Sequence, residues 1–288
     1  MIGSAVSANT VHQRGGGIYN WGTLNVQNGS TIGGAGAPNT ANEGGGIYNY
    51  DGTTTVDGST VSANTAEYGG GIYNETGATT VDGSTISANT ATTDGGGIYN
   101  SYGGTTTVTG STVSANTAYD GGGIYNRVGT TTVTGSTVSA NTATTDGGGI
   151  YNRGTLYVQN GSTIGGAGAG NQATTNGGGI SNYNGTTTVT GSRVLNNTAT
   201  YNGGGVFNNR DVAGATNVTG SCIVGNNAKS FFNNQPAQQI ATGNWWGAAT
   251  GPNTPGADTV LGNVDYSGYL TEPIPVCGFY VYLPLALK

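Results

Sequence analysis

The feature that most constrains this chain is a repeat built on the sequence Gly-Gly-Gly-Ile-Tyr-Asn, which returns in close variants through residues 1–228. Successive copies of its aliphatic residue are 25 to 30 residues apart, most often 26. That residue is found at Ile18, Ile47, Ile72, Ile98, Ile124, Ile150, Ile180 and Val206. A period of this size is typical of a solenoid, in which each unit stacks on the one before it. We therefore predict about eight coils over residues 1–228 and a C-terminal cap and tail over residues 229–288.

The unit that begins at Gly121 shows how one coil is built. It holds three short segments rich in β-branched residues, at 124–126, 130–134 and 137–140, with Gly or Asn at every junction. Such segments are typical of β-strands, whose alternate residues face opposite sides. Pointing the apolar residues inward buries Ile124, Val133, Val138 and Ala140. The predicted fold class is all-β: a parallel β-helix (β-solenoid) with three short strands in each coil of about 26 residues.

Two asparagine positions recur with the repeat. A buried amide can donate to the coil on one side and accept from the coil on the other, so we expect structural ladders. Ligand binding is the alternative, and recurrence in every unit favours the structural role. The first ladder includes Asn49, Asn74, Asn100, Asn126, Asn152 and Asn182, and the second includes Asn64, Asn89, Asn116, Asn141 and Asn197.

The aromatic residue of the repeat forms a row that this alternation turns outward. Stacked rings at strand spacing stabilise the row, and an exposed strip of polar-tipped aromatics is suited to glycan or protein partners. The candidate surface strip consists of Tyr48, Tyr73, Tyr99, Tyr125 and Tyr151.

Threonines form a second outward row, which we take as a candidate Thr face. Its regular Thr-x-Thr spacing suggests ice binding as an alternative function, but Asp57, Asp82 and Tyr157 interrupt the row. Threonine is also simply a good exposed strand residue. The clearest members are Thr105, Thr107, Thr109, Thr130, Thr132 and Thr134.

Few residues here could carry out catalysis. The one histidine is His12, so His-based triads and Cys/His metal sites are not expected. Asp94, Asp120 and Asp146 stack at the corner before the three glycines, where solvated turn acids or a weak Ca²⁺ site are the two interpretations. A polysaccharide lyase or hydrolase would need such acids beside a base. We expect the stacked Arg127 and Arg153 at the opposite corner, away from that row.

Charge and hydropathy limit the partners. With 7 Lys plus Arg and a net charge of −6 there is no basic patch for nucleic acid. No run reaches the roughly 20 apolar residues of a membrane span. Residues 1–4 align with Val133 to Ser136, so the chain begins inside a unit. We expect a missing N-terminal part or head-to-tail self-association.

The C-terminal part departs from the repeat. Phe231, Phe232, Trp245 and Trp246 suit a cap over the open core, and a sugar platform is the alternative reading of the Trp pair. Cys222 occupies the outward position of Arg193 one coil earlier, so a disulfide to Cys277 would pin the last segment to the rod. Two free thiols in a reducing compartment are the alternative. The tail 280–283 could add an edge strand, and 283–288 could be a sorting tail.

The spacing Val138, Asn141, Ala143 followed by Gly148-Gly149-Ile150 resembles the repeats of bacterial right-handed parallel β-helix surface proteins. It is similar in particular to the Gly-Gly-Ala-Ile repeats of polymorphic outer-membrane adhesins. It differs from them in having Gly before Ile and Val or Ile where that family often has Phe. The resemblance implies a right-handed β-helix and an extracellular location, not a reaction.

Taken together, these features predict a non-catalytic extracellular or cell-surface protein without a required cofactor, acting as a rigid spacer or adhesin. A polysaccharide-degrading β-helix enzyme and an ice-binding protein are the alternatives.

Overall fold

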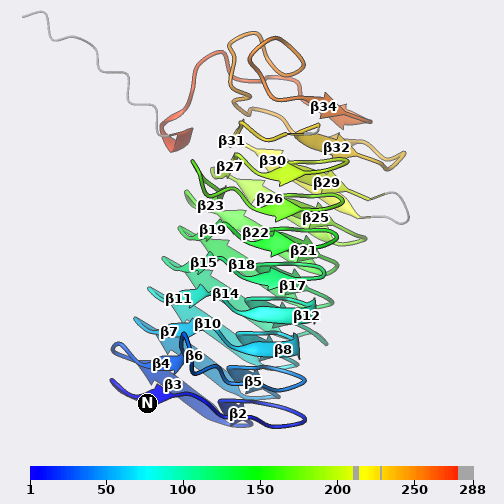
Figure 1. Cartoon of the computed structure of the whole chain (residues 1–288). Helices are drawn as coiled ribbons and strands as arrows, with labels where there is room; N and C mark the ends of the chain where they lie inside the picture. The colour runs from blue at the N-terminus through cyan, green and yellow to red at the C-terminus, as the bar shows by residue number, and fades with distance from the viewer. Residues whose placement is uncertain (210–213, 228, 278–288) are drawn as a thin grey trace, which may run out of the picture.

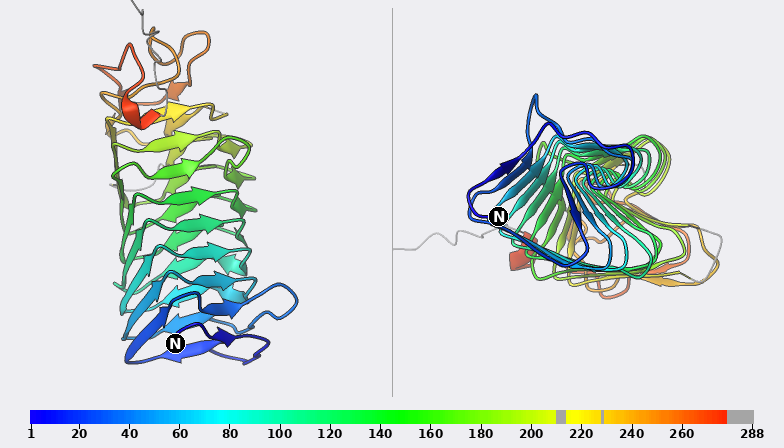
Figure 2. Two further views of the ribbon diagram at one scale, coloured as in Figure 1. Left: turned by 90° about the vertical axis from the view of Figure 1, so that its left-hand side faces the viewer. Right: turned by 90° about the horizontal axis from the view of Figure 1, so that it is seen from below.

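The computed structural model describes residues 1–209, 214–227 and 229–277. It is an all-β parallel solenoid of about ten turns, and each strand pairs in parallel with its counterpart one coil away. Figure 1 shows the coils stacked from the blue N-terminal end, and the right-hand view of Figure 2 shows how they superpose along the axis. The predicted fold class is confirmed. Within the described residues, no helix is long and apolar enough to cross a membrane.

Four parallel sheets run along the rod. The first sheet carries the Ile-Tyr-Asn repeat and consists of β2 (Ile18–Asn20), β5 (Ile47–Asn49), β9 (Ile72–Asn74), β13 (Ile98–Asn100), β17 (Ile124–Asn126), β21 (Ile150–Asn152), β25 (Ile180–Asn182), β29 (Val206–Asn208), β32 (Phe231–Asn233) and β34 (Val260–Leu261). The second sheet consists of β3 (Thr23–Gln27), β6 (Thr53–Asp57), β10 (Ala78–Asp82), β14 (Thr105–Thr109), β18 (Thr130–Thr134), β22 (Thr155–Gln159), β26 (Thr186–Thr190), β30 (Ala215–Thr219), β33 (Gln239–Ile240) and β35 (Val264–Asp265).

The other two sheets have shorter strands. The third consists of β1 (Ala5–Val6), β4 (Thr31–Gly33), β7 (Thr60–Ser62), β11 (Thr85–Ser87), β15 (Thr112–Ser114), β19 (Thr137–Ser139), β23 (Thr163–Gly165), β27 (Arg193–Leu195) and β31 (Cys222–Val224). The fourth consists of β8 (Thr65–Tyr68), β12 (Thr90–Asp94), β16 (Thr117–Ala118), β20 (Thr142–Ala143), β24 (Gln172–Ala173) and β28 (Thr198–Ala199).

Two details of the predicted solenoid are wrong: the number of strands in a coil and the number of coils. A fourth strand follows the Asn turn in six coils, and most of these strands are too short to show any alternation of apolar residues. The number of turns is about ten rather than eight, because β32 to β35 extend the first and second sheets past residue 228. Their sequences no longer match the repeat, so only backbone pairing shows that they continue it.

The core is a column of aliphatic side chains from the first three sheets. Ile124, Val133 and Val138 are fully buried, in register with equivalent residues of neighbouring coils. Ala140 is exposed, contrary to the prediction, and Ala143 is buried in its place. The reason is a turn: Ala140 has a φ of 53°, so the strand alternation stops one residue before it.

The recurrent asparagines form two ladders inside the rod. In the first, Asn100 Nδ2 donates to Asn126 Oδ1 at 2.9 Å and to the carbonyls of Gly104 and Thr130. In the second, the backbone N–H and Nδ2 of Asn116 both donate to Asn141 Oδ1, each at 3.0 Å. These bonds satisfy the backbone groups that the turns leave unpaired inside the coil.

The second ladder ends on a carboxylate. Each asparagine donates toward the C-terminus, so the last one, Asn226, needs an acceptor beyond the repeat. The Asp258 carboxylate supplies it: it accepts a hydrogen bond from the backbone N–H of Asn226 at 2.9 Å and from that of Gly225 at 2.6 Å. The cap therefore completes the hydrogen bonding of the rod as well as its core.

The aromatic residues of the C-terminal part close the core. Phe231 and Trp246 are fully buried and Trp245 is 8% exposed, so the alternative of a Trp sugar platform is wrong. Cys222 pairs with Arg193 in the third sheet, and a disulfide joins it to Cys277 in η1 (Pro275–Cys277). Arg193 Nε also donates to the carbonyl of Val276. The two proposals for the tail, 280–283 and 283–288, lie outside the described residues.

Candidate functional site

The tyrosine row of the first sheet is buried, so the prediction of an exposed strip is wrong. Tyr48, Tyr73, Tyr99, Tyr125 and Tyr151 are 0 to 7% exposed and form a hydrophobic cluster of their own outside the main core. The first ring of the row, Tyr19, is 44% exposed. The strand alternation does turn these rings away from the core. It does not expose them, because the corners on both sides of the strand rise beside the row.

The rings form a regular stack. Consecutive ring centroids from Tyr48 to Tyr151 are 4.8 to 5.0 Å apart, with interplanar angles of 10 to 23°. The faces of the rings therefore pack against one another along the rod axis. Strand side chains stand roughly perpendicular to their sheet, so the phenol hydroxyls lie at the outer edge of the stack.

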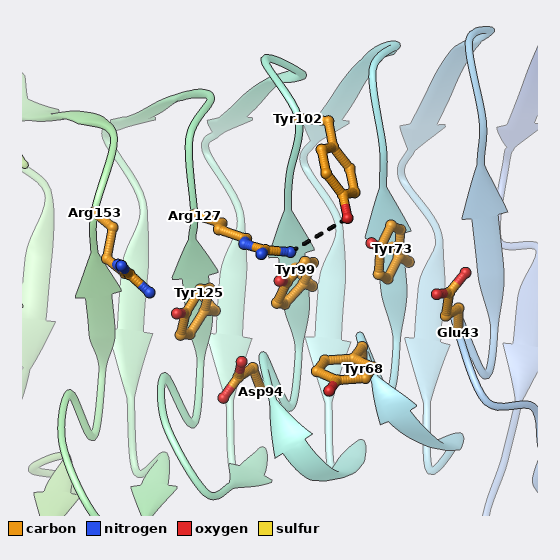
Figure 3. A pocket seen from close by; sticks show the side chains of 9 residues that line it. All are labelled: Glu43, Tyr68, Tyr73, Asp94, Tyr99, Tyr102, Tyr125, Arg127 and Arg153. Carbon is orange, nitrogen blue, oxygen red and sulfur yellow. Dashed lines mark hydrogen bonds between the residues drawn. The ribbon is translucent and has the colours of Figure 1, made fainter.

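Above these hydroxyls lies a cavity of about 290 Å³, which we call the tyrosine groove. Figure 3 shows its floor, with one wall from the corner before the three glycines and one from the turn after the asparagine. The residues that line it are Glu43, Tyr68, Tyr73, Asp94, Tyr99, Tyr102, Tyr125, Arg127 and Arg153.

The groove brings the acidic and basic corners together, contrary to the expectation that the arginines lie away from the aspartates. Asp94, Arg127 and Arg153 line the same cavity. Both corners flank one strand of three residues, which spans only roughly 10 Å. Long side chains from the two ends can therefore meet above the tyrosine between them.

The three stacked aspartates are not equivalent. Asp120 Oδ1 accepts the backbone N–H of Asp146 at 3.0 Å, and Asp146 Oδ1 accepts that of Asn176 at 2.8 Å. Asp94 lacks this bond because the backbone N–H of Asp120 donates to the carbonyl of Thr93 instead. Asp94 is thus the member of the row whose carboxyl group remains available to a ligand in the groove.

Burial raises the pKa of the Asp94 carboxyl to about 7, and the charge of Asp120 adds to this, while Arg127 and Arg153 oppose it. Burial also raises the pKa of Asp120 to about 6, although the backbone N–H of Asp146 stabilises its charged form. Near neutral pH the Asp94 side chain therefore exchanges between a hydrogen-bond donor and a charged acceptor.

The aspartate row does not have the arrangement of a metal site of three or more side chains. Among the residues that the structure describes, no three His, Cys, Asp or Glu side chains are arranged to hold a metal ion. Oxygens of Asp120 and Asp146 already accept backbone N–H groups, which would compete with Ca²⁺ for them. The described residues therefore give no support to the possible weak cation site at Asp94, Asp120 and Asp146, which stays a prediction.

The two arginines of the opposite wall are held by aromatic rings. The guanidinium carbon of Arg127 lies 5.3 Å from the ring centroid of Tyr102, and Nη1 donates to its hydroxyl at 3.4 Å. Arg153 lies 5.3 Å from the ring centroid of Tyr183. In the described chain, neither arginine has a carboxylate within 4.0 Å, whereas Arg14 is paired with Glu43 at 2.7 Å. The middle of the groove therefore holds two guanidinium groups without a salt-bridged carboxylate.

The Thr face lies on the other side of the coil. Thr105, Thr107 and Thr109 of β14 point outward, as do Thr130, Thr132 and Thr134 of β18. The threonines between them point inward, and Thr106 and Thr131 are fully buried. Tyr157 takes a place in the outward row and is 40% exposed, so the face is interrupted as expected.

Sequence reasoning missed Tyr68 and Tyr102, which line the groove, and Tyr183, which holds Arg153. A signal for them was present in the repeat. The position before the three glycines is Glu43, Tyr68 or Asp94 in successive coils, and the position after the asparagine is equally variable. Variable positions in an otherwise uniform repeat mark the groove walls.

No protein-family model, no curated protein and no solved structure matches this chain. The groove is therefore interpreted from its own geometry.

Proposed function

We propose that this protein is a non-catalytic, extracellular β-solenoid adhesin that binds an extended glycan along the tyrosine groove. The observation that carries the proposal is the continuous floor of stacked tyrosines beneath a cavity with polar walls. The floor repeats every 4.8 to 5.0 Å along the rod. A polymer of similar repeat could present the same chemical group to each coil.

The groove has the chemistry that sugar recognition requires. Sugar hydroxyls both donate and accept hydrogen bonds, and the groove offers phenol, carboxyl and guanidinium groups. Burial raises the pKa of Tyr99 to about 12, so its hydroxyl stays protonated at physiological pH and can donate. The floor is also preorganised, because stacked and buried rings lose little freedom when a ligand binds.

Two further observations support the extracellular part of the proposal. The disulfide between Cys222 and Cys277 is typical of oxidising compartments. The repeat also resembles those of bacterial polymorphic outer-membrane adhesins through Val138, Asn141 and Ala143.

A glycan-binding screen with a floor variant tests the proposal. The double variant Tyr99→Phe/Tyr125→Phe removes two hydroxyls and keeps the stack. Phe207, which occupies the same position in β29 and is 4% exposed, shows that phenylalanine fits there. Native protein should bind an extended oligosaccharide, and the double variant should bind it roughly tenfold more weakly, because two hydrogen bonds are lost.

Tyr157→Phe is the matched control, since this tyrosine lies on the Thr face. It should leave binding unchanged. The proposal fails if no glycan binds, or if the control weakens binding as much as the double variant. Shortened or unsaturated sugar products would instead show an enzyme.

A further inference from the structure

We infer that the centre of the tyrosine groove is a subsite for an acidic sugar, whose carboxylate is held between Arg127 and Arg153. This inference rests on the proposed glycan-binding function and specifies the chemical class of the ligand. These two arginines differ from Arg14, whose guanidinium group lies over Tyr48, another ring of the tyrosine row.

Arg14 is already neutralised. Its Nε lies 2.7 Å from Glu43 Oε2, and its Nη1 lies 3.9 Å from Glu75 Oε2. The described part of the chain offers no such partner to Arg127 or Arg153 within 4.0 Å. A guanidinium group without a counter-ion on a cavity wall is a ready site for an anion.

The aromatic contacts fix these two groups in place. Each guanidinium lies 5.3 Å from a ring centroid, Tyr102 for Arg127 and Tyr183 for Arg153. Cation–π contact of this kind orients an arginine without using its positive charge against a carboxylate. Arg127 also hydrogen-bonds to the floor hydroxyl of Tyr99, and Arg153 to that of Tyr125. A guanidinium group has five N–H donors, so donors remain on each arginine for a planar, bidentate acceptor such as a carboxylate.

The two arginines are one coil apart. Arg127 follows Asn126 and Arg153 follows Asn152, and these two asparagines pair in register. On the same two strands, the ring centroids of Tyr125 and Tyr151 are 4.9 Å apart. One carboxylate could therefore contact both guanidinium groups, while sugar hydroxyls on the same ring reach the tyrosine hydroxyls below. Figure 3 shows Arg153 beside Tyr125 and Arg127 extending above Tyr99 toward the hydroxyl of Tyr102, with Asp94 on the other side of the tyrosine row.

The acidic wall does not oppose this arrangement. Glu43 is paired with Arg14, and Asp120 and Asp146 accept backbone N–H groups. Asp94 is the one remaining carboxyl group of the wall in the cavity, and it stands across the floor from the arginines. It can bind a sugar hydroxyl while the acidic group of the same sugar faces the arginines.

The test compares four hexasaccharides by calorimetry: a galacturonic acid hexamer, its methyl ester, neutral cellohexaose and a sulfated galactan hexamer. We expect the galacturonic acid hexamer to bind at least tenfold more tightly than its ester or cellohexaose. Tighter binding of the sulfated hexamer would show that the subsite takes sulfate rather than carboxylate, and would overturn the assignment to a uronic acid.

Variants locate the subsite. Arg127→Gln/Arg153→Gln should weaken binding of the acidic hexamer by roughly tenfold or more, since charge-assisted hydrogen bonds are lost, and should weaken cellohexaose binding by a clearly smaller factor, since only neutral hydrogen bonds are lost there. Lys229→Gln is the control for the single variants Arg127→Gln and Arg153→Gln, because Lys229 contacts Asn202 and Phe232 and does not line the groove. Each single variant lowers the formal net charge by one, from −6 to −7. Thermal unfolding of each variant checks that the fold is retained.

Two outcomes separate this inference from the function on which it rests. If the ester and cellohexaose bind as tightly as the acid, and the arginine double has no effect, the acidic subsite is wrong while glycan binding stands. If none of the four hexamers binds, the glycan-binding function itself fails for these sugars, and the acidic subsite fails with it.

Discussion

The interior of each coil and the walls of the tyrosine groove come from the same repeat but follow different rules. Inside, register pairs identical residues, Ile98 with Ile124 and Asn100 with Asn126. On the walls, the residue before the three glycines changes from Tyr68 to Asp94 between neighbouring coils. The interior requires identity because each side chain completes its neighbour's packing or hydrogen bonds. The walls have no such requirement, so they are where one coil can differ chemically from the next.

The largest effect is expected from breaking the interior. Asn126→Ala removes the acceptor of Asn100 Nδ2 and the donor to the carbonyls of Gly129 and Thr155. Each buried group left unpaired costs about 1 to 3 kcal/mol, so we expect a loss of about 3 kcal/mol or more, measured as a lower urea midpoint. Asn25→Ala, at an exposed position of β3, should change stability by less than about 0.5 kcal/mol. Equal losses would show that the ladder is not what distinguishes the interior.

The groove floor should fall between the interior and the walls. Tyr125→Ala removes a ring that is 4% exposed and stacked on both sides, and should cost about 3 kcal/mol. Tyr125→Phe keeps the ring and should cost about 1 kcal/mol at most. The control Tyr119→Ala, at a ring that is 52% exposed, should have little effect. Unfolding midpoints decide the order, and a harmless Tyr125→Ala would mean that the floor is not structural.

The wall residue Asp94 should make stability depend on pH. Its folded-state pKa of about 7 is above the ordinary 3.8, mainly through burial. The folded protein therefore holds a proton that the unfolded chain releases, and stability falls as pH rises from about 4 to 7. Asp94→Asn should remove this part of the loss and raise the melting temperature at pH 8 but not at pH 4. Asp82→Asn, at an exposed position of β10, is the control. A melting temperature of the native protein that does not fall over this range would contradict the assignment.

The same titration should act on the ligand. Below pH 7 the Asp94 carboxyl is neutral, so Arg127, Arg153 and the protonated Tyr99 and Tyr125 face an acidic sugar with little opposing charge from it. We expect binding of the galacturonic acid hexamer to be several-fold tighter at pH 6 than at pH 8. Asp94→Asn should flatten this dependence. Tighter binding at pH 8 would contradict the placement of the acidic group of the sugar beside the two arginines.

The sequence predicted the interior well and the groove poorly, for a physical reason. Residues such as Ile124 and Asn126 recur because packing requires them, so their period reveals their place. Tyr125 recurs as well, and strand alternation correctly turned it away from the core. What alternation cannot show is that the corners, two residues after the tyrosine and five residues before it, fold up beside it. Placing Arg127 and Asp94 in one cavity needs the path of both corners, which no local pattern contains.

The smallest effect is expected at an exception inside the coil. The inward threonine row accepts from the first ladder: Asn152 Nδ2 donates to Thr187 Oγ1 at 3.0 Å. Thr106 Oγ1 is equally buried but has no hydrogen-bond partner. Leu156, fully buried at the same position, shows that an apolar residue fits there. Thr106→Val should therefore raise stability slightly, by up to about 1 kcal/mol, because it removes an unpaired buried hydroxyl. Thr187→Val should lower it by about the same amount. If both variants lose stability equally, the threonines inside the coil contribute through packing alone. The hydrogen bonds of the ladder to these threonines would then contribute less than the geometry indicates.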